Sequence, residues 1–584
     1  AGPFRYITLL GPVTSGGLAS AAASALPFAA LVLAFGVFAT VIDLRRLLTR
    51  AAVRGPVRTV ARALVIAWAT FPALLDSVRR VSSARELRGE RAAASLVVPV
   101  LELTVERAIV LGASMELRGF AAARQAEPVS GAAVVAVSGA LGFGDRRVLD
   151  GIDLVVEGGM LTLLTGATGS GKSMLLNSMS GLFQHVQDGV QSGVVCIAGV
   201  DRAAVPPRET AGIVGVVAQA VRMSFVAESV ADELAFALEI RDVTPRETGM
   251  RVAAVAELLG ITHLLDRGIV ALSAGEACLV AIGAALITEP LLLLLDEPLA
   301  DLDSSARERV VAVLDRLAHE SGVCVIVAEH ALGAWGGTVD TRLHLADGTV
   351  TRVVPPWRDA IDSVLRPEPA EPDAERVASI RNLSVRYGDR LAVDDAGFDL
   401  RAGELVALAG PNGAGKSSLL RELARPRSAG TVTVAGQDVH ALRARSRRAA
   451  VALVPEAADD LLFATSVSDE CQRAGRSTAE LFERLVGSTD LLERHPRDLS
   501  AGQRLCLVIA IQLARRPRVL LIDEPSRGLD ADARRLVGEA LVDVAAFGAA
   551  VVIATHDSAF ADRYTSRTLT MRSGHVMAAI GVTS

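Results

Sequence analysis

Two short stretches of the sequence carry glycine, lysine and serine at the spacing that a phosphate chain requires. Each stretch follows an apolar run and ends in Lys-Ser, and the first also precedes a helix-compatible apolar run. Glycines let successive backbone N–H groups face one phosphate chain, the lysine reaches the β- and γ-phosphates, and the serine hydroxyl can bind magnesium. The sequence therefore predicts two sites for a nucleoside triphosphate and Mg2+, built on Gly166, Gly169, Gly171, Lys172 and Ser173 and on Gly410, Gly413, Gly415, Lys416 and Ser417.

Each phosphate loop is followed, at a similar interval, by an apolar β-run that ends in Asp-Glu-Pro. The strand would place Asp296 and Asp523 beside the loops, where a carboxylate can hold magnesium through water. The next residue in each copy, Glu297 or Glu524, could then orient or deprotonate an attacking water. A single Asp-Glu pair after an apolar run is commonly a strand-end turn, but two pairs at matching positions favour hydrolysis chemistry.

The matching motifs indicate that a whole domain is repeated. β-runs alternate with helical segments in both copies, which predicts an α/β fold with a parallel sheet and a helical insert in each copy. A stretch rich in Pro, Glu and Asp separates the copies and is typical of an exposed linker. The expected domains are residues 128–353 and 377–584, joined by residues 354–376 and preceded by an all-α membrane and coupling-helix segment over residues 1–127.

In this order, the motifs resemble those of ATP-binding-cassette (ABC) ATPases, and the resemblance implies hydrolysis of ATP with Mg2+. Two Leu-Ser-Ala-Gly stretches resemble the family signature, although Ala stands in place of its middle Gly. The resemblance implies that each signature closes on the γ-phosphate bound by the opposite copy. The residues concerned are Ser273 and Gly275 in the first copy and Ser500 and Gly502 in the second.

The same resemblance assigns roles to further residues. Histidines after a later β-run would contact the γ-phosphate and the water, and two aspartates would lie in the loops that join the two sites. Aromatic side chains would stack on adenine, and a glutamine loop would reach the metal. The matching residues are His330 and His556, Asp303 and Asp530, Phe143 and Tyr387, and Gln219 with Glu456.

Sites of this family are shared between two domains, so the resemblance implies that the two copies form an intramolecular head-to-tail dimer around two ATP molecules. One residue breaks the equivalence of the sites, because Glu456 stands where the first copy has Gln219. Its negative charge would lie near three phosphates and be offset only by the metal. We therefore expect the second site to hydrolyse ATP more slowly, or to need a different metal concentration.

Composition points to a membrane rather than to nucleic acid. The 584 residues carry a net charge of −6, and 51% of them are apolar. No bulk basicity favours nucleic acid, and the apolar excess suggests a membrane-embedded part. Residues 11–42 lack any charge and are long enough to cross a bilayer, although a buried helix is the alternative. The five cysteines form no close pair, which favours reduced thiols over disulfides or a metal site.

Two later helical runs, residues 57–75 and 96–117, have charges at both flanks or within, which favours placement along a membrane surface. Leu-Arg-Gly triplets centred on Arg88 and Arg118 end the helical segments. They resemble the paired Ala-Arg-Gly elements of the T component of energy-coupling factor (ECF) transporters. That resemblance implies coupling helices that dock into grooves of both ATPase copies. The segments after the glutamine loops, residues 224–230 and 461–467, also resemble those of ECF ATPases.

Together these resemblances imply the ATP-hydrolysing module of an ECF importer in the cell membrane, with the ATPase copies on the cytoplasmic side. A separate membrane subunit would capture the cargo, which in this family is usually a vitamin or a transition metal ion. The family's T component has more crossings than this chain shows, which implies either a truncated or reduced form or a further transmembrane subunit as a second partner. The alternatives are the ATPase of an ABC exporter and a soluble twin-cassette protein that acts on ribosomes or DNA.

Overall fold

The computed structural model describes residues 77–89, 97–129, 134–330, 333–355 and 374–578, all of which belong to one compact unit, Ala69–Ser584. The uncharged stretch over residues 11–42 and the helical run over residues 57–75 lie outside the described residues. Most of the predicted linker, residues 354–376, lies outside them as well.

The first cassette, residues 134–353, is built on a six-stranded sheet in the order β10-β9-β3-β8-β7-β6. All neighbouring strands are parallel except β9 and β10. The predicted α/β fold with a parallel sheet is therefore confirmed. The strands are β3 (Leu161–Gly166), β6 (Val214–Val217), β7 (Leu292–Asp296), β8 (Cys324–Glu329), β9 (Thr341–Ala346) and β10 (Thr349–Val353).

Strand β7 shows why this sheet is buried on both faces. Leu293 and Leu295 pack into the apolar cluster beneath the helical insert, whereas Leu292 and Leu294 pack into the cluster on the opposite face, and all four are fully buried. Successive side chains of a strand point to opposite faces, so a continuous leucine run fits a strand that is covered on both sides. The strand end, where Asp296 and Glu297 follow, is thereby held rigidly.

A second, antiparallel sheet in the order β2-β1-β4-β5 stands beside the core sheet, which the sequence prediction of one parallel sheet did not include. The strands of this sheet are antiparallel because a tight turn follows Phe143, which pairs directly with Arg146. Such a short connection joins antiparallel strands, because parallel strands need a long crossover. The strands are β1 (Val135–Phe143), β2 (Arg146–Val156), β4 (Val190–Ile197) and β5 (Val200–Asp201).

The second cassette repeats both sheets, in the orders β16-β17-β18-β13-β19-β20 and β12-β11-β14-β15. Its core strands are β13 (Leu405–Ala409), β16 (Val451–Val454), β17 (Val519–Asp523), β18 (Ala550–Thr555), β19 (Arg567–Arg572) and β20 (His575–Ala578). Its antiparallel strands are β11 (Arg376–Tyr387), β12 (Arg390–Arg401), β14 (Val432–Val434) and β15 (Gln437–Asp438).

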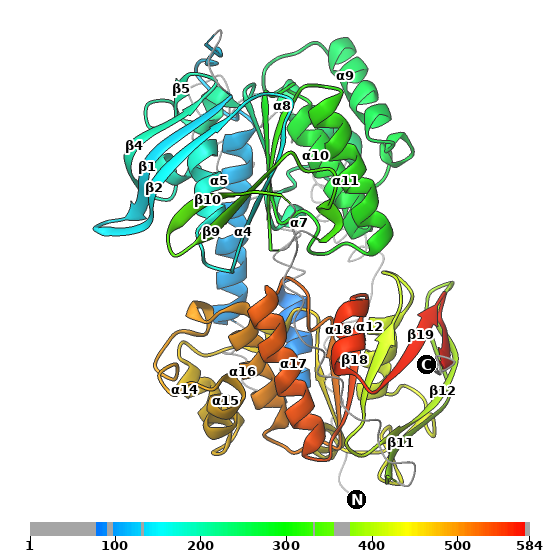
Figure 1. Cartoon of the computed structure of the whole chain (residues 1–584). Helices are drawn as coiled ribbons and strands as arrows, with labels where there is room; N and C mark the ends of the chain where they lie inside the picture. Colours follow the sequence, from blue (N-terminus) through cyan, green and yellow to red (C-terminus); the bar gives the residue numbers. More distant parts are fainter. Residues whose placement is uncertain (1–76, 90–96, 130–133, 331–332, 356–373, 579–584) are drawn as a thin grey trace, which may run out of the picture. The chain divides into compact units, whose positions relative to one another are not determined.

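Helices cover each core sheet, and Figure 1 shows that the helical insert and the antiparallel sheet lie at opposite ends of each cassette. A helical insert is present in each copy, as predicted, and a helix follows each phosphate loop. The first cassette has α5 (Lys172–Ser180), α8 (Val230–Glu239), α9 (Pro245–Leu258), α10 (Ala274–Leu286) and α11 (Ser304–His319). The second has α12 (Lys416–Ala424), α14 (Val467–Ala474), α15 (Thr478–Val486), α16 (Ala501–Leu513), α17 (Ala531–Ala546) and α18 (Ser558–Tyr564).

Two helical segments precede the cassettes. Residues 77–88 are helical, and Val81 and Ala84 are buried in the apolar core of the second cassette. Helix α4 (Val97–Leu117) matches the predicted run over residues 96–117. Among the described residues, no helix has both the length and the apolar character needed to span a bilayer. The predicted all-α membrane and coupling-helix segment, residues 1–127, is described only in part, and the predicted crossing lies outside the described residues.

Candidate functional site

The two phosphate loops have the same backbone shape. Gly171 and Gly415 cap the following helices with φ of 103° and 108°, a left-handed conformation that favours glycine. A Cβ on Gly415 would lie 2.1 Å from the Ala392 carbonyl oxygen, so a side chain is also excluded sterically. The loop therefore needs glycine for its conformation and for the space it leaves.

The loop lysines are buried and point back into their own loops. Lys172 Nζ donates to the Gly166 carbonyl at 2.7 Å, and Lys416 Nζ donates to the Gly410 carbonyl at 2.7 Å. Burial lowers the pKa of Lys172, and the carboxylates of Glu297 and Asp296 partly offset that effect. Each ammonium group thus lies inside its phosphate loop, where phosphate oxygens of a bound nucleotide would replace the loop carbonyls as its hydrogen-bond acceptors.

In the first cassette, Glu297 is gripped by two neighbours. His330 Nε2 lies 2.9 Å from one carboxylate oxygen, and Gln219 Nε2 donates to the other at 2.7 Å. Burial by itself would raise the pKa of Glu297, but the hydrogen bond from His330 and the charges of His330 and Lys172 outweigh it and lower that pKa. The carboxylate is therefore ionised and oriented, as a general base requires.

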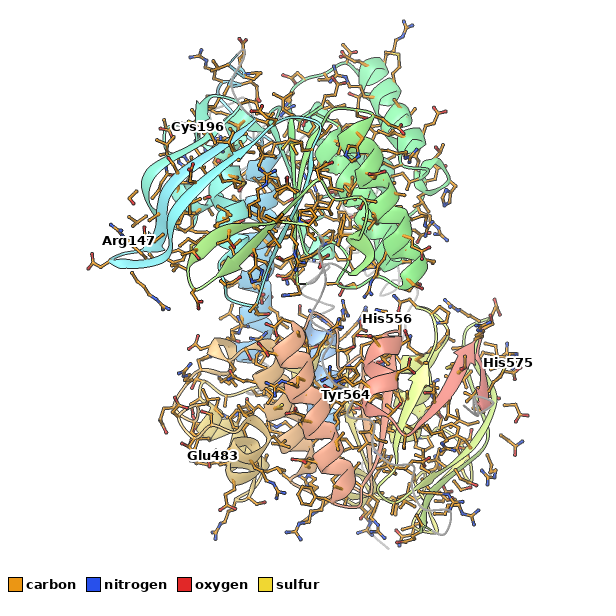
Figure 2. All side chains as sticks on the ribbon, in the orientation of Figure 1. Arg147, Cys196, Glu483, His556, Tyr564 and His575 are labelled. Atoms are coloured by element: carbon orange, nitrogen blue, oxygen red, sulfur yellow. The ribbon has the colours of Figure 1, made fainter. Side chains whose placement is uncertain are left out.

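In the second cassette, Glu524 has different partners. His556 Nδ1 lies 2.9 Å from its carboxylate, and Lys416 Nζ lies 3.3 Å from the other oxygen. Figure 2 shows the labelled His556 beyond β18 in this cassette. Burial is again outweighed by His556 and then Lys416, so the pKa of Glu524 is lowered. In both cassettes the predicted base thus contacts its predicted histidine, but only the first base also accepts a hydrogen bond from a glutamine.

Both glutamates have an unusual backbone. Glu297 and Glu524 have φ of 48° and 52°, although they are not glycine. Their N–H groups donate across to β8 and β18, to the carbonyls of Ala328 at 2.9 Å and Ala554 at 2.8 Å. A non-glycine residue in this region costs about 1–3 kcal/mol and persists where the surroundings enforce it. The same conformation thus recurs in both cassettes at the residue for which we predict catalysis.

The preceding aspartates fit a magnesium ion. Asp296 and Asp523 each have a buried Oδ1 without a hydrogen-bond partner. Burial raises the pKa of each aspartate, and a hydrogen bond with the loop serine, Ser173 or Ser417, lowers it in part. Burial raises the pKa of Asp523 to about 6. An orphaned carboxylate oxygen beside a hydroxyl matches the oxygen ligands that Mg2+ prefers, with phosphate oxygens completing its shell. When bound, the ion would neutralise charge on the phosphates; Ser173, Asp296 and Gln219 would hold it in the first site, and Ser417 and Asp523 in the second.

The signature serines are helix caps. Ser273 Oγ accepts from the N–H of Glu276 at 3.3 Å, and Ser500 Oγ accepts from the N–H of Gln503 at 3.2 Å, and each forms a reciprocal capping box. In the described residues, no hydrogen bond joins either serine to the opposite phosphate loop. A Cβ on Gly275 would lie 2.8 Å from the Ala306 Cβ, and one on Gly502 would lie 2.9 Å from the Ala533 Cβ, so both glycines permit close packing.

The loops that carry Asp303 and Asp530 do contact the opposite cassette. The N–H of Thr168, in the first phosphate loop, donates to Asp530 Oδ2 at 2.7 Å. In the second phosphate loop, Asn412 Nδ2 donates to the Asp301 carbonyl at 3.3 Å. Each aspartate also caps its own helix, α11 or α17. Each phosphate loop is thus hydrogen-bonded to the opposite cassette, an arrangement that agrees with head-to-tail pairing.

The predicted adenine-stacking residues lie at the ends of strands and are half exposed. Phe143 ends β1 and packs edge-on against Phe183, with 5.3 Å between ring centroids. Tyr387 ends β11, and the guanidinium of Arg427 lies 5.3 Å from its ring centroid. Each keeps an exposed fraction near 45%, so an aromatic face is accessible to a base.

Glu456 is where the structure corrects the sequence analysis. We expected its charge to be offset only by the metal, but Arg527 forms an ion pair with it. Arg527 also pairs with Asp301 of the first cassette. Sequence reasoning did not identify Arg527 or Asp301. A comparison of the two copies could have found them, because the position of Arg527 is Ala300 in the first copy.

The two triplet arginines reach matching positions on different cassettes. Arg88 pairs with Glu470 and donates to the Leu461 carbonyl at 2.8 Å, and its guanidinium lies 5.3 Å from the Phe463 ring centroid. Arg118 pairs with Glu233 of the first cassette. Both acidic side chains are fully buried. Each arginine thus forms an ion pair with a buried glutamate of one cassette.

The acidic partners of these arginines were missed by the sequence analysis. Glu233 Oε2 accepts from the N–H groups of Val226 at 2.9 Å and Ala227 at 2.7 Å, and Glu470 accepts from the N–H groups of Phe463 and Ala464. Each carboxylate thus fixes the segment after the glutamine loop and binds the arginine. The available signal was a repeated Ser-Val-x-Asp-Glu pattern at residues 229–233 and 466–470.

The glycine of each triplet is explained by the same docking. Gly89 and Gly119 have φ of 81° and 88°, which favours glycine. A Cβ on Gly89 would lie 2.2 Å from the Arg448 guanidinium carbon of the second cassette, and one on Gly119 would lie 3.3 Å from the Arg208 carbonyl of the first. The triplets therefore end their helices against a cassette surface.

Comparison with known proteins agrees with this geometry. The family model described as ABC transporter matches residues 149–300 and 393–527. A putative ABC transporter ATP-binding protein of Streptomyces avermitilis is 35% identical over 505 residues, covering 73% of this chain and 90% of the relative. The putative HMP/thiamine import ATP-binding protein YkoD of Bacillus subtilis is 29% identical, covering 73% of this chain and 87% of the relative.

Among solved structures, an archaeal ribosome recycling factor, aABCE1, in complex with the ribosomal stalk protein aP1, has a TM-score of 0.51 at 20% identity. That likeness covers 74% of this chain and 88% of the other, and it shows a shared fold alone. The two matched regions contain both phosphate loops and both Asp-Glu pairs. The chain therefore belongs to the ATP-binding proteins of ABC transporters and carries two ABC ATPase domains in tandem.

Proposed function

We propose that this chain is the ATP-hydrolysing energy-coupling module of an ECF-type importer. Its two sites would bind ATP with Mg2+ and hydrolyse it, and closure of the cassette pair would move the arginine-tipped helices. A separate membrane subunit would capture the cargo and reorient in response. The module would lie at the cell membrane with its cassettes on the cytoplasmic side.

The observation that carries this proposal is the paired docking of Arg88 and Arg118. One guanidinium enters each cassette and pairs with a buried carboxylate, Glu470 in α14 or Glu233 in α8. Each carboxylate also accepts from N–H groups of the segment after the glutamine-loop position. That segment, residues 224–230 or 461–467, starts seven residues after the end of β6 or β16. A change in the nucleotide site therefore has a short, rigid route to each arginine.

Helix α4 supports the same proposal because it contacts both cassettes. Glu102 pairs with Arg497 of the second cassette, with 3.0 Å between Oε2 and Nη2, and Ser114 Oγ donates to the Ser224 carbonyl of the first at 2.8 Å. Its remaining face carries Leu101, Val105 and Ile109, spaced by four residues and about half to two-thirds exposed. We propose that a membrane subunit contacts this apolar stripe.

The cargo class follows from the relatives and not from this chain. The B. subtilis relative carries the name of an HMP/thiamine import protein. A vitamin or its precursor is therefore our first candidate cargo, and a transition metal ion is the second. The capturing subunit, which would determine the cargo, is a separate chain in this proposal.

The test is to purify the full chain from membranes of its native host with its bound partners and reconstitute the complex in lipid vesicles. We expect a co-purifying integral membrane subunit and ATP-dependent uptake of a vitamin. Arg88→Ala and Arg118→Ala should each abolish uptake while ATP binding remains. Cargo moving outward, or recovery of the chain with ribosomes instead of membranes, would overturn the proposal.

A further inference from the structure

Arg527 lies between two carboxylates that belong to different cassettes. Its Nη1 pairs with Glu456, at the glutamine-loop position of the second site, and its Nε pairs with Asp301, in the loop of the first cassette that leads to α11. Asp301 is in turn held by the second phosphate loop, because Asn412 donates to its carbonyl at 3.3 Å. The three charged side chains therefore form one bridge beside the second site.

The first site has no counterpart to any of the three charges. Counting from the catalytic glutamates, Arg527 matches Ala300 and Asp301 matches Gly528, and Glu456 matches Gln219. One site thus has a neutral set, Gln219, Ala300 and Gly528. The other has a set with charges −1, +1 and −1. Three positions that differ together, and whose charges pair, are better explained by a shared task than by three independent changes.

The charges beside the second site indicate what this shared task is. A carboxylate at the glutamine-loop position would repel the phosphates of ATP if it were unpaired. Burial would lower the pKa of Arg527, but the carboxylates of Asp301 and Glu456 outweigh it and raise that pKa, so the guanidinium is charged. A guanidinium offers several N–H donors in a fixed plane, which lets one side chain hold two carboxylates at once.

We propose that Arg527 is a positioning residue of the second ATP site that neutralises Glu456 and fastens it to Asp301 of the opposite cassette. This ion-pair bridge then joins the two cassettes beside the second site. The inference uses only the ATP-binding function that the family shows, and it does not depend on the importer role proposed above.

The first experiment uses full-length chain in which Lys172→Ala disables the first site, so that Mg-ATP binding reports on the second. Arg527→Ala should weaken Mg-ATP binding by about three- to tenfold, because partly exposed ion pairs are modest in strength. Adding Glu456→Gln, which recreates the neutral Gln-Ala combination of the first site, should restore affinity to within about twofold. High salt should shrink the defect of the single variant.

An unchanged affinity in Arg527→Ala, or a double variant as weak as the single one, would overturn the proposal. Arg527→Lys is the folding control, since it keeps the charge and should retain most of the affinity. Ala300→Gly, the matched change in the first cassette, should leave Mg-ATP binding at the second site unaltered.

A second measurement tests the tie between cassettes. Spin labels on exposed positions of α11 and α17 report the distance between the cassettes in the full-length chain without nucleotide. Asp301→Asn should broaden that distance distribution, and Ser305→Ala, a nearby change that leaves the bridge intact, should not. An identical distribution for Asp301→Asn would show that the bridge does not hold the cassettes together.

Discussion

The two cassettes have the same architecture and differ in how their charged groups are partnered. Both share the strand order, the buried loop lysine, the left-handed backbone conformation of the glutamate predicted to be the base, and the capping box at the signature. Gln219 holds the base in the first site, whereas Lys416 approaches the base in the second and Glu456 turns to Arg527. The two sites thus share their backbone geometry and their glutamate–histidine contact, and they differ in the further partners of the glutamate and of the glutamine-loop residue.

In the signature region, both cassettes make the same hydrogen bond to a backbone carbonyl, but the donor arginines stand at different sequence positions. In the second cassette, Arg504 Nη1 donates to the Leu499 carbonyl, directly before the signature serine, at 2.8 Å. In the first cassette the matching position is Ala277, and Arg222 from the segment after Gln219 donates to the equivalent carbonyl of Leu272 instead. The same carbonyl is held from a different element, so position alone does not identify equivalent residues.

The largest expected effect tests what the cassettes share. Glu297→Gln with Glu524→Gln removes both bases and should lower ATP turnover by about a thousandfold or more, because general base catalysis contributes 10²–10⁴-fold. ATP binding should survive, since neither glutamate is needed to grip the phosphates. Steady-state ATPase assays and nucleotide-binding titrations measure the two quantities. Turnover near the wild-type rate would remove both glutamates from the mechanism.

The next prediction tests whether the ion pairs of Arg88 and Arg118 with the buried glutamates contribute equally to stability. Arg88→Ala leaves Glu470 buried and unpaired, and Arg118→Ala does the same to Glu233, so each should destabilise its own cassette by roughly 3–5 kcal/mol. Thermal unfolding followed by hydrogen exchange of each cassette separates the two effects. Arg425→Ala removes a pair of exposed side chains with Glu86 and is the control with little expected loss. A loss spread evenly over both cassettes would contradict separate docking.

The third prediction concerns a carboxylate that only the first cassette has. Glu329 is buried beside Glu297 and accepts from the Leu299 N–H at 3.1 Å, whereas Thr555 occupies the matching position in the second cassette. Burial, with a contribution from the Glu297 charge, raises the pKa of Glu329 from 4.5 to about 7. Between these values the folded state binds the proton more tightly than the unfolded state, so stability falls as pH rises through this window.

Glu329→Gln should therefore stabilise the first cassette by about 3 kcal/mol above pH 7 and leave it nearly unchanged below pH 4.5. The measurement is the unfolding midpoint of each cassette as a function of pH. The second cassette, which has no titrating group at this position, is the internal reference. A variant with the same pH profile as wild type would show that Glu329 keeps an ordinary pKa.

The smallest prediction tests an equality. Ser273→Ala and Ser500→Ala each remove an N-cap and should cost about 1 kcal/mol in their own cassette. The capping boxes have the same geometry, so the two losses should agree within a few tenths of a kcal/mol. Denaturant unfolding of the two variants measures both. A large inequality would show that the signature helices are not equivalent in stability.

The fold and the loop residues could be predicted because they follow from local pattern. Glycine spacing, apolar β-runs and Asp-Glu ends determine the strand-loop-helix units, and those units bring Lys172, Asp296, Glu297 and His330 together. The partners of Arg88 and the ion pairs of Glu456 could not be predicted in the same way. Arg527 and Glu456 are 71 positions apart, and Arg88 and Glu470 are 382 positions apart. No local spacing links such residues; a comparison of the two copies marks some of these positions, and only the folded geometry shows which side chains pair.

The comparison of the two sites can be tested most directly with the single variants Glu297→Gln and Glu524→Gln. Each leaves one site with its base, so the initial ATPase rates of the two full-length variants compare the second site with the first. Because the second base lacks the glutamine and instead pairs with the lysine that must hold phosphate, Glu297→Gln should retain less activity than Glu524→Gln. Equal rates for the two variants, or a faster Glu297→Gln, would contradict the inequality of the sites.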